Sequence, residues 1–131
     1  MEHEQTSSSG LLQRGLDGAD DAIYIADRGG MILYANSATE AITGYTKSEL
    51  IGQKTSIFSS GLMDEEYFRR LWKTILNGDV WREAITNRRK DGGLYECTQT
   101  ITPVLDGDGN VTAFFAVQRD ITRAKELRHE L

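Results

Sequence analysis

The chain has 131 residues, of which 39% are hydrophobic and 27% are charged, and its formal net charge is −5. This length gives room for one hydrophobic core, so we expect a single domain. The negative charge argues against a nucleic-acid-binding protein, because such proteins gather basic side chains against phosphates. Cys97 is the only cysteine, so no internal disulfide bond can form, and apolar runs such as 113–117 are too short to cross a bilayer. We therefore expect a cytoplasmic domain that does not insert into a membrane.

The first 20 residues precede the domain itself. Residues 1–9 are polar and rich in serine, which predicts a disordered tail. Leu11, Leu12 and Leu16 then follow at helical spacing and predict a flanking helix over residues 10–20. One small domain has little surface with which to cover the apolar stripe of this helix, so we expect the stripe to serve a contact with a second copy.

Two short helices are indicated by their capping residues. Ser37 with Glu40, and Thr46 with Glu49, each have the Ser/Thr-x-x-Glu spacing of a capping box. A longer helix follows, because residues 64–66 are acidic and the next ten residues present a wide apolar face. These helices lie between two groups of strands.

Runs of β-forming residues, separated by turn signals, predict the strands. The last three runs follow one another directly, which is typical of an antiparallel meander. From residue 123 the chain is charged and has a helical pattern, so we interpret 123–131 as the start of a linker helix. The prediction is an α+β fold over residues 21–122, with one five-stranded antiparallel sheet and flanking N- and C-terminal helices. The predicted strands are 22–26, 31–35, 81–89, 94–104 and 111–120.

The sequence contains no catalytic or metal-binding constellation. His3 and His129 stand at opposite ends of the chain, so neither zinc nor haem has a histidine ligand within the domain. Cys97 likewise has no histidine partner that could activate it as a nucleophile. The run 106–110 is spaced like the start of a calcium loop, but the glycine and glutamate that this loop requires are missing, so a hairpin turn is favoured. We therefore expect no enzyme activity, no haem and no metal.

Several short motifs occur in order along the chain. They are Ile32-Leu33-Tyr34-Ala35-Asn36, Thr43-Gly44-Tyr45, Glu49-Leu50-Ile51-Gly52, Leu71-Trp72 with Gly78 and Trp81, Asn87-Arg88-Arg89-Lys90-Asp91-Gly92, Ile101-Thr102-Pro103-Val104 and Asp120-Ile121-Thr122. Together they resemble the PAS family of sensory domains over residues 11–122. The family implies a sheet whose concave face is covered by short helices and forms a pocket for a flavin, a haem or a small metabolite. It also implies a signal that leaves after Thr122 toward a C-terminal effector, often a histidine kinase or a cyclic-dinucleotide enzyme.

Within the family, the segment from Trp72 to Gly92 is similar to the flavin-binding redox sensors of the nitrogen-fixation regulator type. This similarity implies that Asn87 binds the pyrimidine ring of the flavin. An amide suits that edge because it carries a donor and an acceptor together. Ile85 shares a strand face with Asn87, and Trp72 would pack near the ring. The implied cofactor is FAD, with FMN as the alternative.

The light-sensing flavin branch of the family gives a second comparison. Its last strand carries a glutamine beside flavin N5 and O4, and Gln118 matches that position. Cys97 replaces the second flavin-binding asparagine of that branch, which removes one polar contact. The photoreactive cysteine would fall near Thr55 or Ser56, and neither side chain can form a thiol adduct. We therefore expect no light-driven adduct chemistry.

Two functions stay open at this stage. The first is a flavin-binding redox sensor in a larger signalling protein. The second is a cofactor-free or metabolite-binding relay module that forms a homodimer through its N-terminal helix and its sheet. In the second case, Asn87 satisfies backbone groups at a strand end and Trp72 belongs to the core. The candidate cofactor-binding residues are Asn87, Gln118, Trp72, Cys97, Ile85 and Thr55, and the candidate relay residues are Gln118, Asp120 and Thr122.

Overall fold

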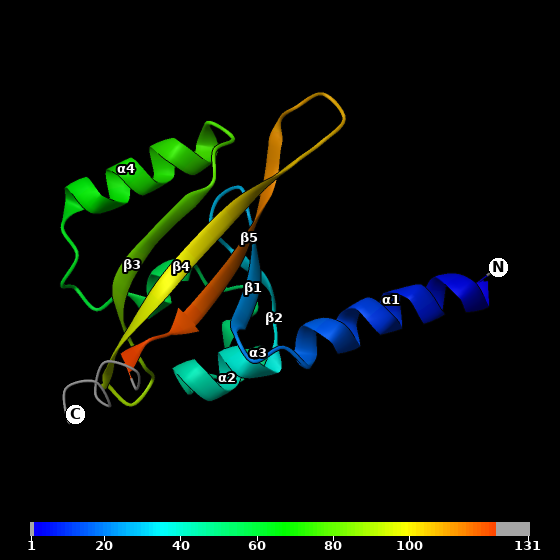
Figure 1. Cartoon of the computed structure of the whole chain (residues 1–131), viewed down its shortest axis with the longest axis horizontal. Coiled ribbons are helices and arrows are strands. Elements are labelled where there is room, and N and C mark those ends of the chain that lie inside the picture. Colours follow the sequence, from blue (N-terminus) through cyan, green and yellow to red (C-terminus); the bar gives the residue numbers. More distant parts are fainter. Residues whose placement is uncertain (1, 123–131) are drawn as a thin grey trace.

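One antiparallel sheet with strand order β2-β1-β5-β4-β3 forms the centre of the molecule (Figure 1). The computed structural model describes residues 2–122, and the side chains of residues 10–122. The predicted five-stranded sheet and the β3-β4-β5 meander are confirmed, and each strand end lies within one residue of its predicted position. The strands are β1 (Ala22–Asp27), β2 (Ile32–Ala35), β3 (Trp81–Arg88), β4 (Leu94–Leu105) and β5 (Val111–Asp120).

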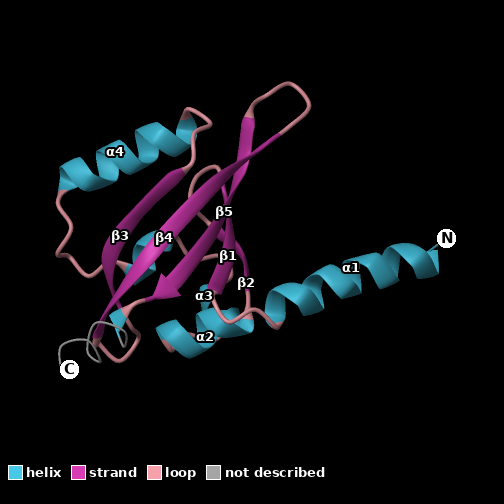
Figure 2. Ribbon diagram, viewed as in Figure 1, coloured by secondary structure: helices cyan, strands magenta, loops and turns pink. Residues whose placement is uncertain are grey.

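Among the described residues, the helices that cover the sheet all lie in the connection between β2 and β3 (Figure 2). They are α2 (Ser37–Thr43), α3 (Lys47–Leu50), the 3₁₀ helix η1 (Thr55–Phe58) and α4 (Glu65–Leu76). In α4, the side chain of Asp64 accepts a hydrogen bond from the backbone N–H of Tyr67 at 2.8 Å and caps the acidic first turn. Tyr67, Leu71 and Ile75 recur every four residues and are buried. This spacing packs α4 against β3 and β4.

The two predicted capping boxes have different outcomes. In α3 the box is present, because the Thr46 hydroxyl accepts from the Glu49 N–H at 3.2 Å and the Glu49 carboxylate accepts from the Thr46 N–H at 2.9 Å. In α2 the predicted Ser37 cap was wrong. The cap is Asn36, whose Oδ1 accepts from the Thr39 N–H at 3.0 Å. A buried asparagine one residue earlier therefore takes the role that the sequence spacing assigned to the serine.

Helix α1 (Glu2–Asp17) extends away from the sheet, and its C-terminal end contacts the domain (Figure 1). The Asp17 carboxylate accepts hydrogen bonds from Lys47 Nζ at 2.9 Å and from the Tyr34 hydroxyl at 3.1 Å. The helix starts at Glu2, so the structure differs from the prediction of a disordered 1–9 tail followed by a helix over 10–20. Serine has only a modest helix penalty, and no proline interrupts this segment.

Two further predictions concern the ends of the chain and the membrane. The predicted linker helix, 123–131, lies outside the described residues. Within the described part of the chain, no helix combines the length and the hydropathy needed to cross a membrane.

Candidate functional site

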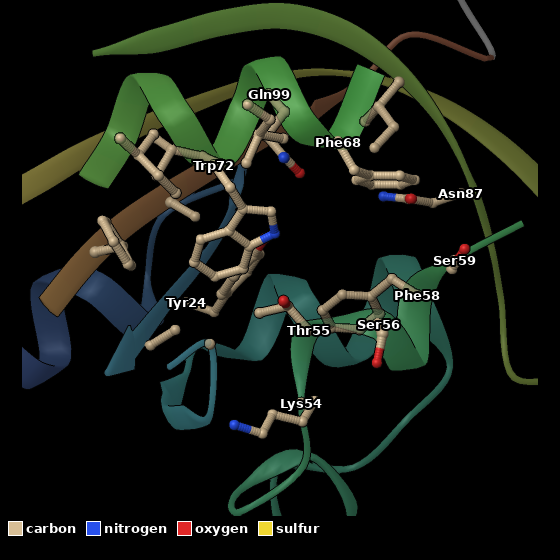
Figure 3. Close-up of a pocket in the computed structure, with 18 of the residues that line it drawn as sticks. Tyr24, Lys54, Thr55, Ser56, Phe58, Ser59, Phe68, Trp72, Asn87 and Gln99 are labelled. Carbon is tan, nitrogen blue, oxygen red and sulfur yellow. The ribbon is translucent and has the colours of Figure 1, made fainter. Parts of the chain in front are cut away.

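A cavity of about 460 Å³ lies between the sheet and the helices that cover it (Figure 3). This volume is in the range of pockets that bind small organic ligands. Aromatic and aliphatic side chains make most of the wall: Tyr24, Phe58, Phe68, Leu71, Trp72, Ile75, Ile85, Ile101 and Phe114. The polar side chains of the wall are Asn87, Gln99 and Gln118 from the sheet, and Lys54, Thr55, Ser56 and Ser59 from the segment around η1.

The cavity brings together most of the residues that the sequence selected. Five of the six candidate cofactor residues line it, and the exception is Cys97. Thr55 and Ser56 lie in η1 and line the cavity opposite the sheet. Gln99 also lines the cavity and was missed. The residues of the prediction that line the wall are Asn87, Gln118, Trp72, Ile85 and Thr55.

Asn87 faces the cavity near the end of β3. Asn87 is only 3% exposed, and its neighbour across the β3–β4 ladder is Tyr95. Ile85, two residues earlier, lies on the same face, as the strand alternation predicted. Burial raises the pKa of the Tyr95 hydroxyl, and its polar neighbour Asn87 opposes that rise.

Trp72 reaches the cavity from α4 and also has core contacts. Its ring packs edge-to-face against Phe114, with centroids 5.8 Å apart and an interplanar angle of 81°. Gly30 has φ +88°, and a Cβ there would lie 3.1 Å from Cη2 of Trp72. Glycine therefore allows both the turn and the close approach of the indole. Trp72 therefore packs against Phe114 and also lines the cavity.

A chain of buried hydrogen bonds runs across β4 and β5 on the cavity face. The Tyr95 hydroxyl donates to Gln118 Oε1 at 3.2 Å, and Gln118 Nε2 donates to Gln99 Oε1 at 2.6 Å. Gln118 and Gln99 lie directly opposite each other in the β4–β5 ladder. These residues are 1% and 4% exposed, so the hydrogen bonds are shielded from water. Gln118 is therefore held at both ends of its amide.

The candidate relay residues meet where β5 ends. Asp120 forms an ion pair with Arg89 at 3.3 Å and accepts a hydrogen bond from the Thr122 N–H at 2.9 Å. The Thr122 hydroxyl accepts from the Glu96 N–H on β4 at 2.7 Å. The Arg89 guanidinium also lies over the ring of Tyr95, 4.7 Å from its centroid. Contacts therefore connect the cavity wall with the end of the domain.

Cys97 is fully buried in β4 and does not line the cavity. Its neighbours in the sheet are Ile85 and Asp120. Burial, and secondarily the Asp120 carboxylate, raise the pKa of the Cys97 thiol to about 12. Because the thiolate is the reactive form, we expect the native protein to react with an aromatic disulfide reagent at pH 8 more than ~100-fold more slowly than the denatured protein. Equal rates in the two states would show that the thiol is accessible.

The described residues contain no group of three or more acidic, histidine or cysteine side chains that could hold a metal ion. The polar groups of the cavity are amides, hydroxyls and one ammonium. Groups of these kinds can donate and accept hydrogen bonds.

Comparison with known proteins gives matches along nearly the whole chain. A family model described as the PAS fold matches residues 10–121. The nitrogen fixation regulatory protein of Klebsiella oxytoca is 35% identical over 122 residues, which cover 93% of this chain and 25% of that protein. The chain therefore spans about a quarter of the length of this relative.

Solved structures with the same fold include two light-oxygen-voltage proteins. An RNA-binding light-oxygen-voltage receptor has a TM-score of 0.84 and 31% identity, covering 90% of this chain and 34% of that chain. A light-oxygen-voltage domain studied with a flavin analogue has a TM-score of 0.74 and 25% identity, covering 92% of this chain and 94% of that chain.

Proposed function

The chain belongs to the PAS family, and we propose that it binds a flavin in the cavity between the sheet and α4, as the redox-sensing domain of a larger signalling protein. The observation that carries this proposal is the combination of an aromatic wall with buried amides that face the cavity. Similarity to a nitrogen fixation regulatory protein, and to a light-oxygen-voltage domain studied with a flavin analogue, supports the choice of ligand. We propose FAD from the first similarity, with FMN as the alternative.

The residues of the cavity suit each part of a flavin. Phe68 and Trp72 from α4, with Phe58 from η1, offer flat apolar surfaces to a planar ring. The Asn87 amide can pair with the N3–H and C=O groups of the pyrimidine ring. Lys54 lines the cavity and is exposed, so its ammonium can approach a phosphate on the ribityl chain. When bound, the flavin supplies an edge whose hydrogen-bonding character changes with its redox state.

The test of this proposal is a titration of the purified protein with riboflavin, FMN and FAD. We expect saturable quenching of tryptophan fluorescence by at least one of them, and a weaker signal in Trp72→Phe, since Trp81 does not line the cavity. ADP and ribose 5-phosphate serve as controls that lack the ring system. Quenching that rises linearly, without saturation, for all three flavins would contradict the proposal.

We propose that a signal leaves the cavity through Gln118, Asp120 and Thr122. Gln118 lines the cavity two residues before Asp120, whose carboxylate binds both Arg89 and the Thr122 N–H. A change at the amide of Gln118 therefore acts on the strand end that precedes the effector.

Replacing Gln118 with Leu is expected to interrupt this relay while saturable flavin binding remains. The measurement is the change in backbone amide chemical shifts at residues 120–122 when flavin is added. These changes should be present in the wild type and absent in the variant. Flavin-induced shifts that persist at these residues in Gln118→Leu would show that the signal takes another route.

Exposed leucines on α1 favour a second candidate function, a dimerising relay module that needs no cofactor. Leu11 and Leu12 are 64% and 68% exposed on a helix that extends away from the sheet (Figure 1). We expect a dimer in light scattering that dissociates in the double variant Leu11→Glu, Leu12→Glu, because charges at an apolar contact lose their hydration. Leu62→Glu is the matched control, since Leu62 is also 64% exposed and lies in a loop. A dimer that survives in the double variant excludes α1 as the interface.

A further inference from the structure

Gln99 has hydrogen-bonding capacity that no described residue uses. Its Oε1 accepts the hydrogen bond from Gln118, while its Nε2 makes no hydrogen bond to any residue that the structure describes. The residue is 4% exposed, and its amide points into the cavity (Figure 3). Its N–H₂ group therefore opens onto the cavity, where a bound ligand can accept a hydrogen bond from it.

The direction of the hydrogen-bond chain determines which end of Gln99 faces the ligand. Tyr95 donates its hydroxyl proton to Gln118 Oε1, which turns Gln118 Nε2 toward Gln99 and leaves Gln99 Nε2 for the cavity. If the Gln118 amide were flipped, its oxygen would face Gln99, and the Gln99 amide would have to flip as well. The Gln99 oxygen, instead of its N–H₂ group, would then face the cavity.

We infer that Gln99 is the specificity-determining residue of the site. The hydrogen bonds from Tyr95 to Gln118 and from Gln118 to Gln99 leave the Gln99 N–H₂ group facing the cavity, so Gln99 selects a ligand edge built of hydrogen-bond acceptors. The inference rests on the proposed flavin function and deepens it. An oxidised flavin has such an edge at N5 and O4, whereas the reduced ring carries an N–H at N5. Gln118, which the sequence matched to the N5-facing glutamine, then sets the orientation of Gln99.

The experiment compares riboflavin with 5-deazariboflavin, in which a C–H group replaces N5 and removes one acceptor. Dissociation constants are measured by fluorescence titration for the wild type, Gln99→Met and the control Gln53→Leu, an exposed glutamine outside the cavity wall. We expect the wild type and the control to bind riboflavin roughly tenfold more tightly than the deaza analogue. Gln99→Met should bind both about equally, with riboflavin affinity reduced by about tenfold.

A second variant tests the donor-to-acceptor direction of these hydrogen bonds. Tyr95→Phe removes the hydroxyl that fixes Gln118 and keeps the ring beneath Arg89. We expect it to lose most of the discrimination between the two flavins, whereas Tyr67→Phe should keep it. Tyr67 is a matched control, because its hydroxyl also makes one hydrogen bond, to the Ala84 carbonyl at 3.0 Å, but lies outside both the Tyr95–Gln118–Gln99 hydrogen bonds and the cavity wall.

The outcomes separate this inference from the function on which it rests. Riboflavin and 5-deazariboflavin binding equally to the wild type would overturn the role of Gln99 and leave the flavin proposal standing. If Gln99→Met still binds riboflavin more tightly than 5-deazariboflavin, the role of Gln99 is likewise overturned and the flavin proposal stands. If no flavin binds the wild type with saturation, both the role of Gln99 and the proposed flavin function are overturned.

Discussion

Replacing Asn36 with alanine is expected to lower the free energy of unfolding by roughly 3–5 kcal/mol. Asn36 is fully buried, and its Oδ1 accepts hydrogen bonds from the Ile23 N–H at 2.9 Å and from the Thr39 N–H and hydroxyl at 3.0 and 2.8 Å. Its Nδ2 donates to the carbonyls of Leu16 and Asp21 at 2.9 and 3.0 Å. Alanine removes the cap of α2 and also the link between β1 and the end of α1.

Urea denaturation of wild type and variant measures this difference. Ser37→Ala is the matched control, because Ser37 stands at the predicted cap position but is exposed and does not serve as the cap. We expect the control to change the free energy of unfolding by less than about 0.5 kcal/mol. An Asn36→Ala variant as stable as the control would show that the network contributes little to folding.

Replacing Asn87 with leucine is expected to weaken flavin binding by roughly 10- to 100-fold and to leave the fold intact. Leucine has the same branching at Cγ but no polar atoms, so it leaves the N3–H and C=O groups of the ring without partners in a buried site. Asn87→Asp should bind more weakly than the wild type as well, because a carboxylate offers acceptors only and loses the donor for the ring carbonyl. The variants lose contacts to the ligand and not contacts that hold the fold together. Both should therefore keep the strand signals of the wild-type circular dichroism spectrum.

Titration of each variant with the flavin that binds the wild type most tightly checks this prediction. Asn77→Leu is the control, since Asn77 is an exposed asparagine at the end of α4 and does not line the cavity. The control should bind as the wild type does. Wild-type affinity in Asn87→Leu would remove Asn87 from the binding site and favour its interpretation as a structural asparagine.

The strands were predictable because local signals define them. Turn residues at 90–93 and 106–110 separate runs of β-forming residues, and antiparallel neighbours need only short connections. The cap of α2 was assigned one residue late because Asn36 combines a helix cap with long-range contacts to β1. Sequence spacing does not contain those contacts.

The candidate site was predictable in part for the same reason. Family motifs selected Asn87, Trp72 and Gln118, and strand alternation placed Ile85 beside Asn87. Gln99 was missed because its role depends on the β4–β5 register, which places it opposite Gln118. The available signal was a glutamine on the inward face of β4, two residues after Cys97, where a polar side chain needs a buried partner.

The absorption spectrum of the purified protein, with its cofactor released by heat and identified, tests the central claim most directly. Binding of flavin in the cavity predicts the paired near-ultraviolet and visible bands of an oxidised flavin, either as isolated or after incubation with FAD or FMN. The bands should be reduced in Asn87→Leu at equal protein concentration. A protein that stays colourless after incubation with both flavins would contradict flavin binding and favour the cofactor-free relay.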